Sequence, residues 1–167
     1  MRASTPGGRR GCYDCVRFVD EELCYAIIEA SDDNQLGELI GSGRVLIPTR
    51  LAASPVHALQ AYRLAARAVE GGYSRARKLP VEVLLYLVAA RGGDATRLSL
   101  SEVASEGPRP REPLLVPCSR GDCERLIEEY GCAEPEWSGL DERLALARTA
   151  LAALEVERKR GGHEGTA

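Results

Sequence analysis

Residues 54–72 read SPVHALQAYRLAARAVEGG and residues 80–90 read PVEVLLYLVAA, and both stretches are predicted to be helices. The opening Ser-Pro pair of the first stretch favours a helix start, because serine caps and proline fits the first helical position. The closing glycine pair favours a helix end. The second stretch is apolar nearly all round except at Glu82, which predicts a helix at the centre of the core.

Shorter patterns on either side complete the predicted element order. Runs rich in β-formers, bounded by turn residues, indicate strands. We expect strands at 13–19, 24–29, 45–47 and 113–117, the first two forming a hairpin. Capping residues and glycines indicate further helices. We expect these between 31 and 43, at 98–105, between 119 and 131, and from Ser138 to Arg160.

Helices and short strands do not alternate regularly, so the predicted fold class is α+β. We expect a single domain over 11–160, with a small, mainly antiparallel sheet packed by several helices and a long C-terminal helix. Residues 1–10 are predicted to be a flexible N-terminus and 161–167 a disordered tail. The final helix is expected to be amphipathic, with cations at its end that suit the helix dipole. Its apolar positions are Leu140, Leu144, Ala147, Leu151 and Leu154.

Composition narrows the functional classes. The chain has 167 residues, 22 Lys+Arg and 25 Asp+Glu, for a net charge of -3. This balance excludes nucleic-acid binding driven by whole-chain charge, although a local basic face is possible. No run reaches the roughly 18 apolar residues of a membrane span, and no secretory signal is recognisable, so a cytoplasmic protein is expected. Asn, Gln and Met are scarce, which fits a thermophile. Arginine outnumbers lysine 20 to 2, which fits either a thermophile or nucleotide bias in the genome.

The six cysteines leave three alternatives open: structural disulfides or buried thiols, a metal site, or redox catalysis. Their positions are Cys12, Cys15, Cys24, Cys118, Cys123 and Cys132. The first two form a CxxC pair within a predicted strand. Residues three apart on a strand point to opposite faces, which argues against a shared chelating pair. Disulfides are accepted in cytosolic proteins of hyperthermophiles, and we expect neither metal nor cofactor.

Catalytic signatures are missing from the sequence. It contains no GxGxxG, GxxxxGK[ST], HExxH or GxSxG motif. His57 has three interpretations: a catalytic base, a ligand contact, or ordinary packing at a helix start. Glu82 is either a functional buried carboxylate or a first-turn contact with the helix dipole. A small-molecule enzyme built on these two residues stays an alternative, but a non-enzyme is expected.

A basic cluster gives a sharper signal. Arg75, Arg77 and Lys78 share one loop, and Arg91 and Arg97 bracket the turn at the other end of the following helix. An 11-residue helix is about 16 Å long, a distance that a single-stranded nucleic-acid tail can span. Arginine forks suit phosphates, and a neighbouring tyrosine, Tyr73, offers a stacking surface. The alternative is a set of solvated surface arginines.

The segment from Ser54 to Val103 carries a family resemblance. It reads Ser54-Pro-Val-His-Ala-Leu-Gln-Ala-Tyr-Arg-Leu-Ala, then the basic loop, then Val81-Glu-Val-Leu-Leu-Tyr-Leu-Val-Ala-Ala-Arg, then a glycine turn. This resembles the small kinase-binding subunit of the KEOPS complex, the PRPK-binding protein family, of the archaeal type. The order of the other predicted elements agrees from Tyr13 to Arg160. The turn is longer than in the family and lacks its Arg-Gln-Ile, and the cysteines are not a family feature.

The resemblance implies an α+β accessory subunit that is not itself an enzyme. Such a subunit docks on the N-terminal lobe of the small atypical kinase/ATPase of the complex, stimulates it, and meets the other subunits indirectly. It also helps to recruit tRNA through the single-stranded 3′ CCA end, and the complex completes threonylcarbamoyladenosine. For this chain, tRNA contacts are expected at the basic cluster with His57 and Tyr73. A kinase interface is expected at Leu100, Val103 and part of the final helix.

Overall fold

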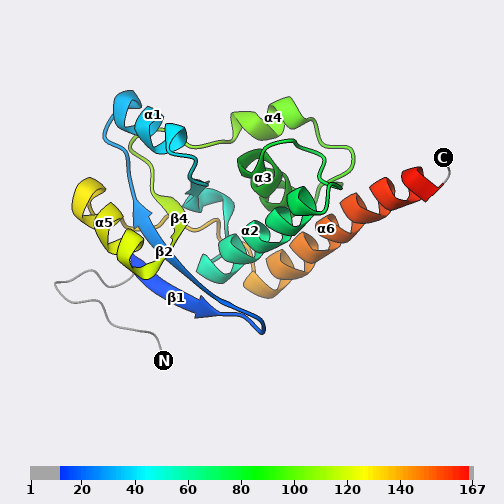
Figure 1. The fold of residues 1–167 in the computed structure, drawn as a ribbon, viewed down its shortest axis with the longest axis horizontal. Helices are drawn as coiled ribbons and strands as arrows, with labels where there is room; N and C mark the ends of the chain where they lie inside the picture. Colours follow the sequence, from blue (N-terminus) through cyan, green and yellow to red (C-terminus); the bar gives the residue numbers. More distant parts are fainter. Residues whose placement is uncertain (1–11, 166–167) are drawn as a thin grey trace. The chain divides into compact units, whose positions relative to one another are not determined.

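The computed structural model describes residues 12–165, with side chains described as far as residue 160. These residues form two compact units (Figure 1). Unit 1 combines the described residues up to 50 with 108–138, and unit 2 combines 51–107 with the residues from 139 onward. The flexible segment predicted at 1–10 lies outside the described residues, as do residues 166–167 of the predicted tail. The disorder predicted from 161 is wrong for 161–165, because the last helix continues through these residues. The domain bounds 11–160 stay a prediction.

Unit 1 contains a four-stranded antiparallel sheet with the strand order β1-β2-β4-β3. β1 (Tyr13–Arg17) and β2 (Glu22–Ile28) form the predicted hairpin. β4 (Leu114–Cys118) pairs with β2 although a long helical segment separates the two strands in sequence. The two-residue β3 (Ile47–Pro48) forms the far edge, where a proline is tolerated because its open side needs no ladder bond. The predicted α+β class and small antiparallel sheet are confirmed.

The sheet is buried along its two central strands. Consecutive apolar residues there are shielded from solvent, as expected for strands covered on both faces: Ala26, Ile27, Ile28, Leu114, Leu115 and Val116. α1 (Asp33–Gly41) begins after Asp32, and α5 (Arg120–Tyr130) begins after Ser119. Both cap residues accept a backbone N–H of the first turn. α5 packs on β2 and β4. A short 3-10 helix, η1 (Thr49–Leu51), follows β3.

The described part of unit 2 consists of helices. These are α2 (Pro55–Glu70), α3 (Leu79–Ala89), α4 (Leu100–Ser105) and α6 (Glu142–Gly165). α2 packs against α3 and α6, and α3 also contacts α4 and α6. The predicted central position of α3 is confirmed, because seven of its residues are buried: Glu82, Val83, Leu84, Leu85, Tyr86, Leu87 and Ala89.

α6 buries a different face from the one that its leucines mark. Leu144, Leu151 and Leu154 are 44%, 55% and 52% exposed. The buried face carries smaller side chains instead: Ala145, Thr149, Ala152 and Val156. Small residues allow α6 to approach α2 and α3 closely, since the interaxial distance depends on the side chains at the contact. We call the three exposed residues the leucine stripe.

α6 also begins later than predicted. Gly139 has a φ of +82°, a left-handed conformation that cannot belong to a right-handed helix. The carboxylate of Asp141 accepts the N–H of Leu144 at 3.0 Å and caps the helix. The start predicted at Ser138 is therefore wrong, and the glycine is the reason.

All six cysteines form disulfides within unit 1. The pairs are Cys12–Cys132, Cys15–Cys24 and Cys118–Cys123. The two members of the CxxC pair have different partners, in agreement with the prediction that they point to opposite faces of the strand. The structure therefore contains disulfides and no free thiol.

The double variant Cys12→Ser/Cys132→Ser should lose more stability than Cys118→Ser/Cys123→Ser. The sequence separations are 120 and 5, and a cross-link that closes a longer loop removes more entropy from the unfolded chain. The chain-entropy relation gives about 5 kcal/mol for the long loop and about 2 kcal/mol for the short one. Chemical denaturation followed by circular dichroism measures both values. Equal losses would contradict the prediction.

Candidate functional site

The basic loop before α3 and the turn after it meet within unit 2. Nη1 of Arg75 donates to the carbonyl oxygens of Ala95 and Leu98, each at 2.7 Å. The chain after α3 therefore returns to the loop that precedes the helix. The expected separation by the length of α3 is wrong for Arg75, because its side chain links the two segments directly.

A pocket of about 540 Å³ lies at this junction. Its lining residues are Arg75, Thr96, Val156, Lys159 and Arg160, so three of the five are cationic. Val156 is buried beneath the pocket lining, whereas Lys159 and Arg160 are exposed. We call this site the cationic pocket. Its volume lies in the range of pockets that hold small organic ligands, such as a nucleotide.

Asp94 positions the polar wall of the cationic pocket. Its Oδ1 accepts hydrogen bonds from the backbone N–H and the hydroxyl of Thr96, at 2.9 and 2.7 Å. These bonds lower the pKa of Asp94 from its ordinary value, and the nearby charges of Arg97 and Lys159 lower it further. Asp94 therefore carries its negative charge at neutral pH and holds the threonine in place.

The side chains of the cationic pocket are suited to binding an anion. Arginine and lysine side chains donate charge-assisted hydrogen bonds to phosphate or carboxylate oxygens. Val156 is only 1% exposed, so it offers a ligand almost no apolar surface. The described lining holds neither a carboxylate nor an imidazole. The arrangement therefore suits recognition of an anionic group.

The other predicted tRNA contacts lie outside the pocket lining. Arg77, Lys78 and Arg91 are exposed. Arg97 is 86% exposed and forms an ion pair with Asp94 at 3.6 Å. Tyr73 is half-buried, and burial together with the carboxylate of Glu157 raises the pKa of its hydroxyl. Of the predicted set, only Arg75 lines the pocket.

Sequence reasoning missed the contribution of α6 to this pocket. The run Arg158-Lys-Arg160 is visible in the sequence, but the helix dipole explains such a run equally well. Thr96 and Val156 carry no signal of their own. Only the packing of α6 beside the turn at 91–98 shows that these residues share a site with Arg75.

His57 is fully buried, and both of its ring nitrogens have partners. Nδ1 accepts the N–H of Ala53 at 3.0 Å, which leaves the proton on Nε2 to donate to the hydroxyl of Thr149 at 2.8 Å. Burial lowers the pKa of His57 to about 4. The neutral ring thus joins α2 to α6 and exposes no atom to a ligand. This placement matches ordinary packing and gives the predicted ligand contact no support.

Glu82 is also buried, and its carboxylate binds the backbone of the basic loop. Its Oε1 accepts the N–H of Ala76 at 2.8 Å. Its Oε2 and the hydroxyl of Tyr86 have no direct hydrogen-bond partner. Burial, and next the Glu82 carboxyl one turn away, raise the pKa of Tyr86. Glu82 therefore serves as a fixed anchor for the segment that begins at Arg75.

The expected kinase interface is wrong at one of its two named positions. Val103 is 2% exposed and belongs to the core of unit 2, so it offers no surface to a partner. Leu100 is partly exposed. The expectation that part of the final helix is involved has a clearer basis, because the leucine stripe of α6 is the largest exposed aliphatic set on any described helix.

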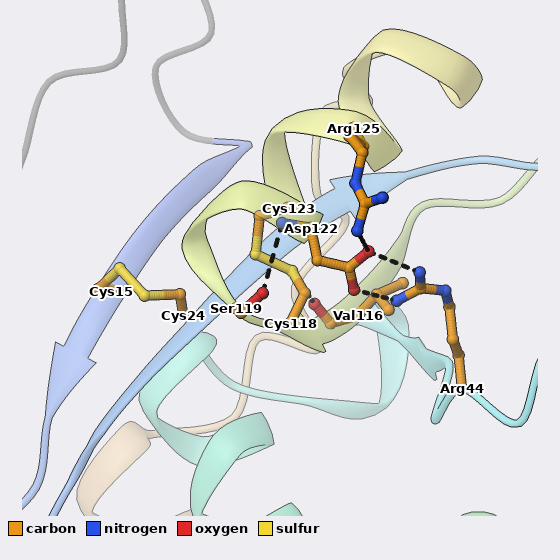
Figure 2. The surroundings of a disulfide bond; sticks show 9 residues. All are labelled: Cys15, Cys24, Arg44, Val116, Cys118, Ser119, Asp122, Cys123 and Arg125. Carbon is orange, nitrogen blue, oxygen red and sulfur yellow. Dashed lines mark hydrogen bonds and ion pairs between the residues drawn. A yellow bond between two sulfur atoms is a disulfide. The ribbon is translucent and has the colours of Figure 1, made fainter.

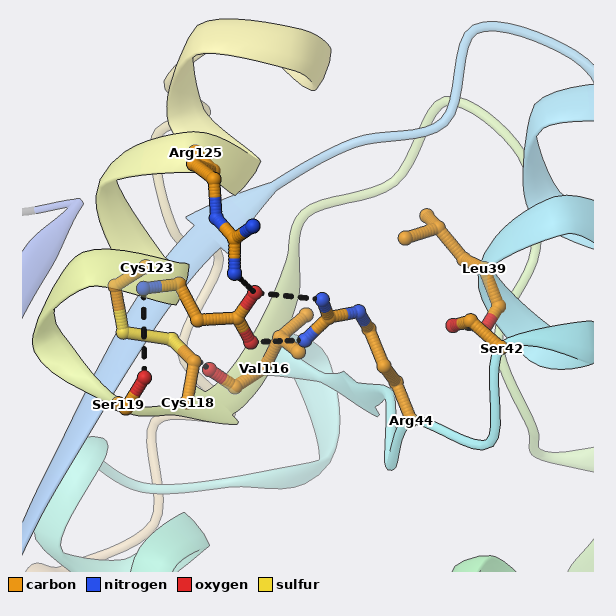
Figure 3. A network of polar contacts seen from close by, with 9 residues as sticks. Leu39, Ser42, Arg44, Val116, Cys118, Ser119, Cys123 and Arg125 are labelled. Carbon is orange, nitrogen blue, oxygen red and sulfur yellow. Dashed lines mark hydrogen bonds and ion pairs between the residues drawn. A yellow bond between two sulfur atoms is a disulfide. The ribbon is translucent and has the colours of Figure 1, made fainter.

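The cysteine region forms a separate cluster in unit 1 (Figure 2). Donor atoms of Cys15, Glu22 and Cys24 lie within 4.8 Å of one another, but both sulfurs are engaged in a disulfide and are not metal ligands in this state. Nearby, Arg44 donates to both carboxylate oxygens of Asp122, at 2.5 and 2.8 Å, and lowers the pKa of Asp122 (Figure 3). This ion pair fixes the first turn of α5.

Acid should weaken the protein through His57. Above pH 6.5 the ring is neutral in both the folded and the unfolded chain. Between pH 6.5 and about 4 the ring is protonated in the unfolded chain but stays neutral in the folded chain. The free energy of unfolding should therefore fall by roughly 3 kcal/mol as the pH drops through this window. The variant His57→Gln should lose this part of the pH dependence. His163→Gln, which changes the other histidine, should keep it, and denaturation at several pH values separates the two.

Searches against family models and against curated proteins found no match to this chain, so the family resemblance depends on sequence pattern and element order alone. None of the helices within 12–165 combines the length and the apolar character that crossing a bilayer requires. The geometry of the cationic pocket and of the leucine stripe is therefore the basis for a functional proposal.

Proposed function

We propose that this chain is a non-catalytic accessory subunit of the KEOPS type, which binds a small atypical kinase and the single-stranded 3′ end of tRNA. One observation carries the proposal: α6 has an exposed leucine stripe along one side and contributes two cations to a pocket near its end. A partner protein and an anionic ligand would thus be held by a single rigid element. In the cell, such a subunit would support threonylcarbamoyladenosine formation in the cytoplasm.

The leucine stripe supports the protein-binding part. Leu151 and Leu154 follow Leu144 by seven and ten residues, so the three side chains lie on one side of the helix. Isolated exposed leucines are common, but three on one helix side form an apolar strip that water solvates poorly. Helix faces with this spacing typically dock into an apolar groove of a partner. The kinase is proposed as that partner because of the family resemblance.

The cationic pocket supports the RNA-binding part. Arg75, Lys159 and Arg160 together can neutralise only a few phosphates, and the chain as a whole has a net charge of -3. Binding by the isolated chain is therefore expected to be weak and sensitive to salt. Within a complex, additional RNA contacts from other subunits would raise the overall affinity by avidity.

The enzyme alternative has less support. It requires His57 and Glu82 to share a polar pocket, but both side chains are fully buried, and neither lines the cationic pocket. The lowered pKa of His57 would leave the ring a weak base.

The double variant Leu151→Asp/Leu154→Asp should bind the cognate small kinase at least thirtyfold more weakly, the loss typical of interface residues that contribute about 2 kcal/mol. Stimulation of the kinase's ATPase rate should fall with it. Ile40→Asp is the matched control, because Ile40 is 53% exposed on α1. Pull-down, titration calorimetry and ATPase assays provide the measurements. Unchanged binding by the double variant would remove the stripe from the interface.

Lys159→Ala and Arg160→Ala should each weaken binding of a short single-stranded RNA that ends in CCA. Each lost phosphate contact should lower the salt slope, the dependence of log K on log salt, by about 0.7. Arg125→Ala is the control, since this arginine is 77% exposed but belongs to unit 1. Fluorescence anisotropy at several salt concentrations gives the slopes. Equal effects of all three variants would point to non-specific charge and against the pocket.

A further inference from the structure

Three cysteines of unit 1 lie in one row across the sheet. The register places Cys24 of β2 opposite Cys15 of β1 on one side and opposite Cys118 of β4 on the other. Residues directly opposite in a sheet share a face. Cys24 is bonded to Cys15, and Cys118 is bonded to Cys123 of α5 (Figure 2). The middle cysteine of the row therefore has a second cysteine beside it that is not its present partner.

Backbone hydrogen bonds set the spacing in this row. Ile27 N–H donates to Cys12 C=O and Phe18 N–H donates to Glu21 C=O, so these are hydrogen-bonded positions of the hairpin. Hydrogen-bonded and non-hydrogen-bonded pairs alternate along an antiparallel hairpin. Cys15 lies three residues after Cys12 and three before Phe18, so Cys15 and Cys24 form a non-hydrogen-bonded pair, the kind in which the two Cα atoms are closest.

The N–H and C=O of Cys24 therefore point away from β1 and toward β4. This makes Cys24 and Cys118 a hydrogen-bonded pair, for which the Cα–Cα distance is about 5.5 Å. That distance lies within the range of Cα separations that disulfides span. The Cβ atoms of a hydrogen-bonded pair are about 5.5 Å apart, roughly 1 Å more than a disulfide allows, so a Cys24–Cys118 bond requires β2 and β4 to approach locally but no change of strand register.

Two cysteines of the row are half-buried: Cys15 on the edge strand β1, and Cys118 on β4, which has a strand on each side. Cys24 is 7% exposed, and Cys123 is fully buried where α5 packs on β2 and β4. A thiolate displaces sulfur from a disulfide by attacking in line with the S–S bond. Among residues 12–165 no strand pairs with the outer side of β1, so we expect an external thiol to approach Cys15 from this edge, opposite to its bond with Cys24.

We propose that Cys15 is a site of S-thiolation by small thiols, and that Cys24 passes the exchange on to Cys118 so that Cys123 is released. In the first step a thiolate RS⁻ bonds to Sγ of Cys15, the Cys15–Cys24 bond breaks, and Cys24 leaves as a thiolate. In the second step the Cys24 thiolate bonds to Sγ of Cys118, the Cys118–Cys123 bond breaks, and Cys123 takes up the proton that RSH gave. Two disulfides are present before and after, so no oxidant or reductant is consumed.

The exchange would leave α5 attached to the sheet by polar contacts. Arg44 still holds Asp122, and Arg120 still pairs with Glu22 at 2.9 Å. The covalent link between β4 and α5 is replaced by a link between β4 and β2, while a thiol appears inside the unit. The third disulfide takes no part, because Cys12 is three residues from Cys15 and points to the other face.

The test on the wild-type protein uses 2-mercaptoethanol as the probe. The oxidised chain is incubated with it at pH 8, quenched in acid, alkylated with N-ethylmaleimide, digested at low pH and mapped by mass spectrometry. The expected products are a mercaptoethanol adduct on Cys15, a Cys24–Cys118 disulfide and an alkylated Cys123. An adduct on Cys118, or an adduct on Cys15 with alkylated Cys24 and an intact Cys118–Cys123 bond, overturns the proposal.

A variant pair tests the same exchange without an added thiol. Cys123→Ser leaves Cys118 without its helix partner, so the alkylated thiol should move from Cys118 to Cys15 as the Cys24–Cys118 bond forms. Cys132→Ser is the matched control: it frees Cys12, which lies outside the row, and the two other disulfides should stay intact. An unchanged Cys15–Cys24 bond in Cys123→Ser, or exchange of the same extent in Cys132→Ser, contradicts the relay. Circular dichroism confirms that each variant is folded.

Discussion

The pairing of β2 with β4 is the contact on which unit 1 depends. It joins strands that a long helical segment separates in sequence, and it sets the order of the whole sheet. The chain after β3 and the chain before β4 are held together beside this pairing: Thr49 N–H donates to the carbonyl of Pro113 at 3.1 Å, and Arg50 pairs with Glu112 at 2.7 Å. Bringing such distant residues together costs loop entropy, which the buried strands and the disulfides offset.

The same pairing determines the cysteine chemistry. A shift of the register by one residue would move Cys118 to the opposite face from Cys24. In the observed register the two are direct neighbours, and the hairpin places Cys15 on the other side. A sheet that brings three cysteines into one row offers an alternative disulfide that needs a local approach of two strands but no change of register.

Unit 2 depends on the close packing of α6. Its buried face carries only small and medium side chains, while the neutral ring of His57 bonds to Thr149 in the same contact. Larger side chains on this face would separate the helices and break that hydrogen bond. The leucines are consequently left on the outside, and the cations near the helix end come to lie beside Arg75. The way α6 packs thus produces both the leucine stripe and the cationic pocket on which the proposed function depends.

The element order, the α+β class, the central position of α3 and the Ser54 cap could be predicted from the sequence, because local propensity and hydrophobic period act within a few residues. The spacing of Cys12 and Cys15 also predicted that they face apart. The buried face of α6, the cysteine pairing, and the position of Lys159 and Arg160 beside Arg75 could be seen only in the folded chain. These features depend on contacts between residues far apart in sequence, and no local pattern specifies them.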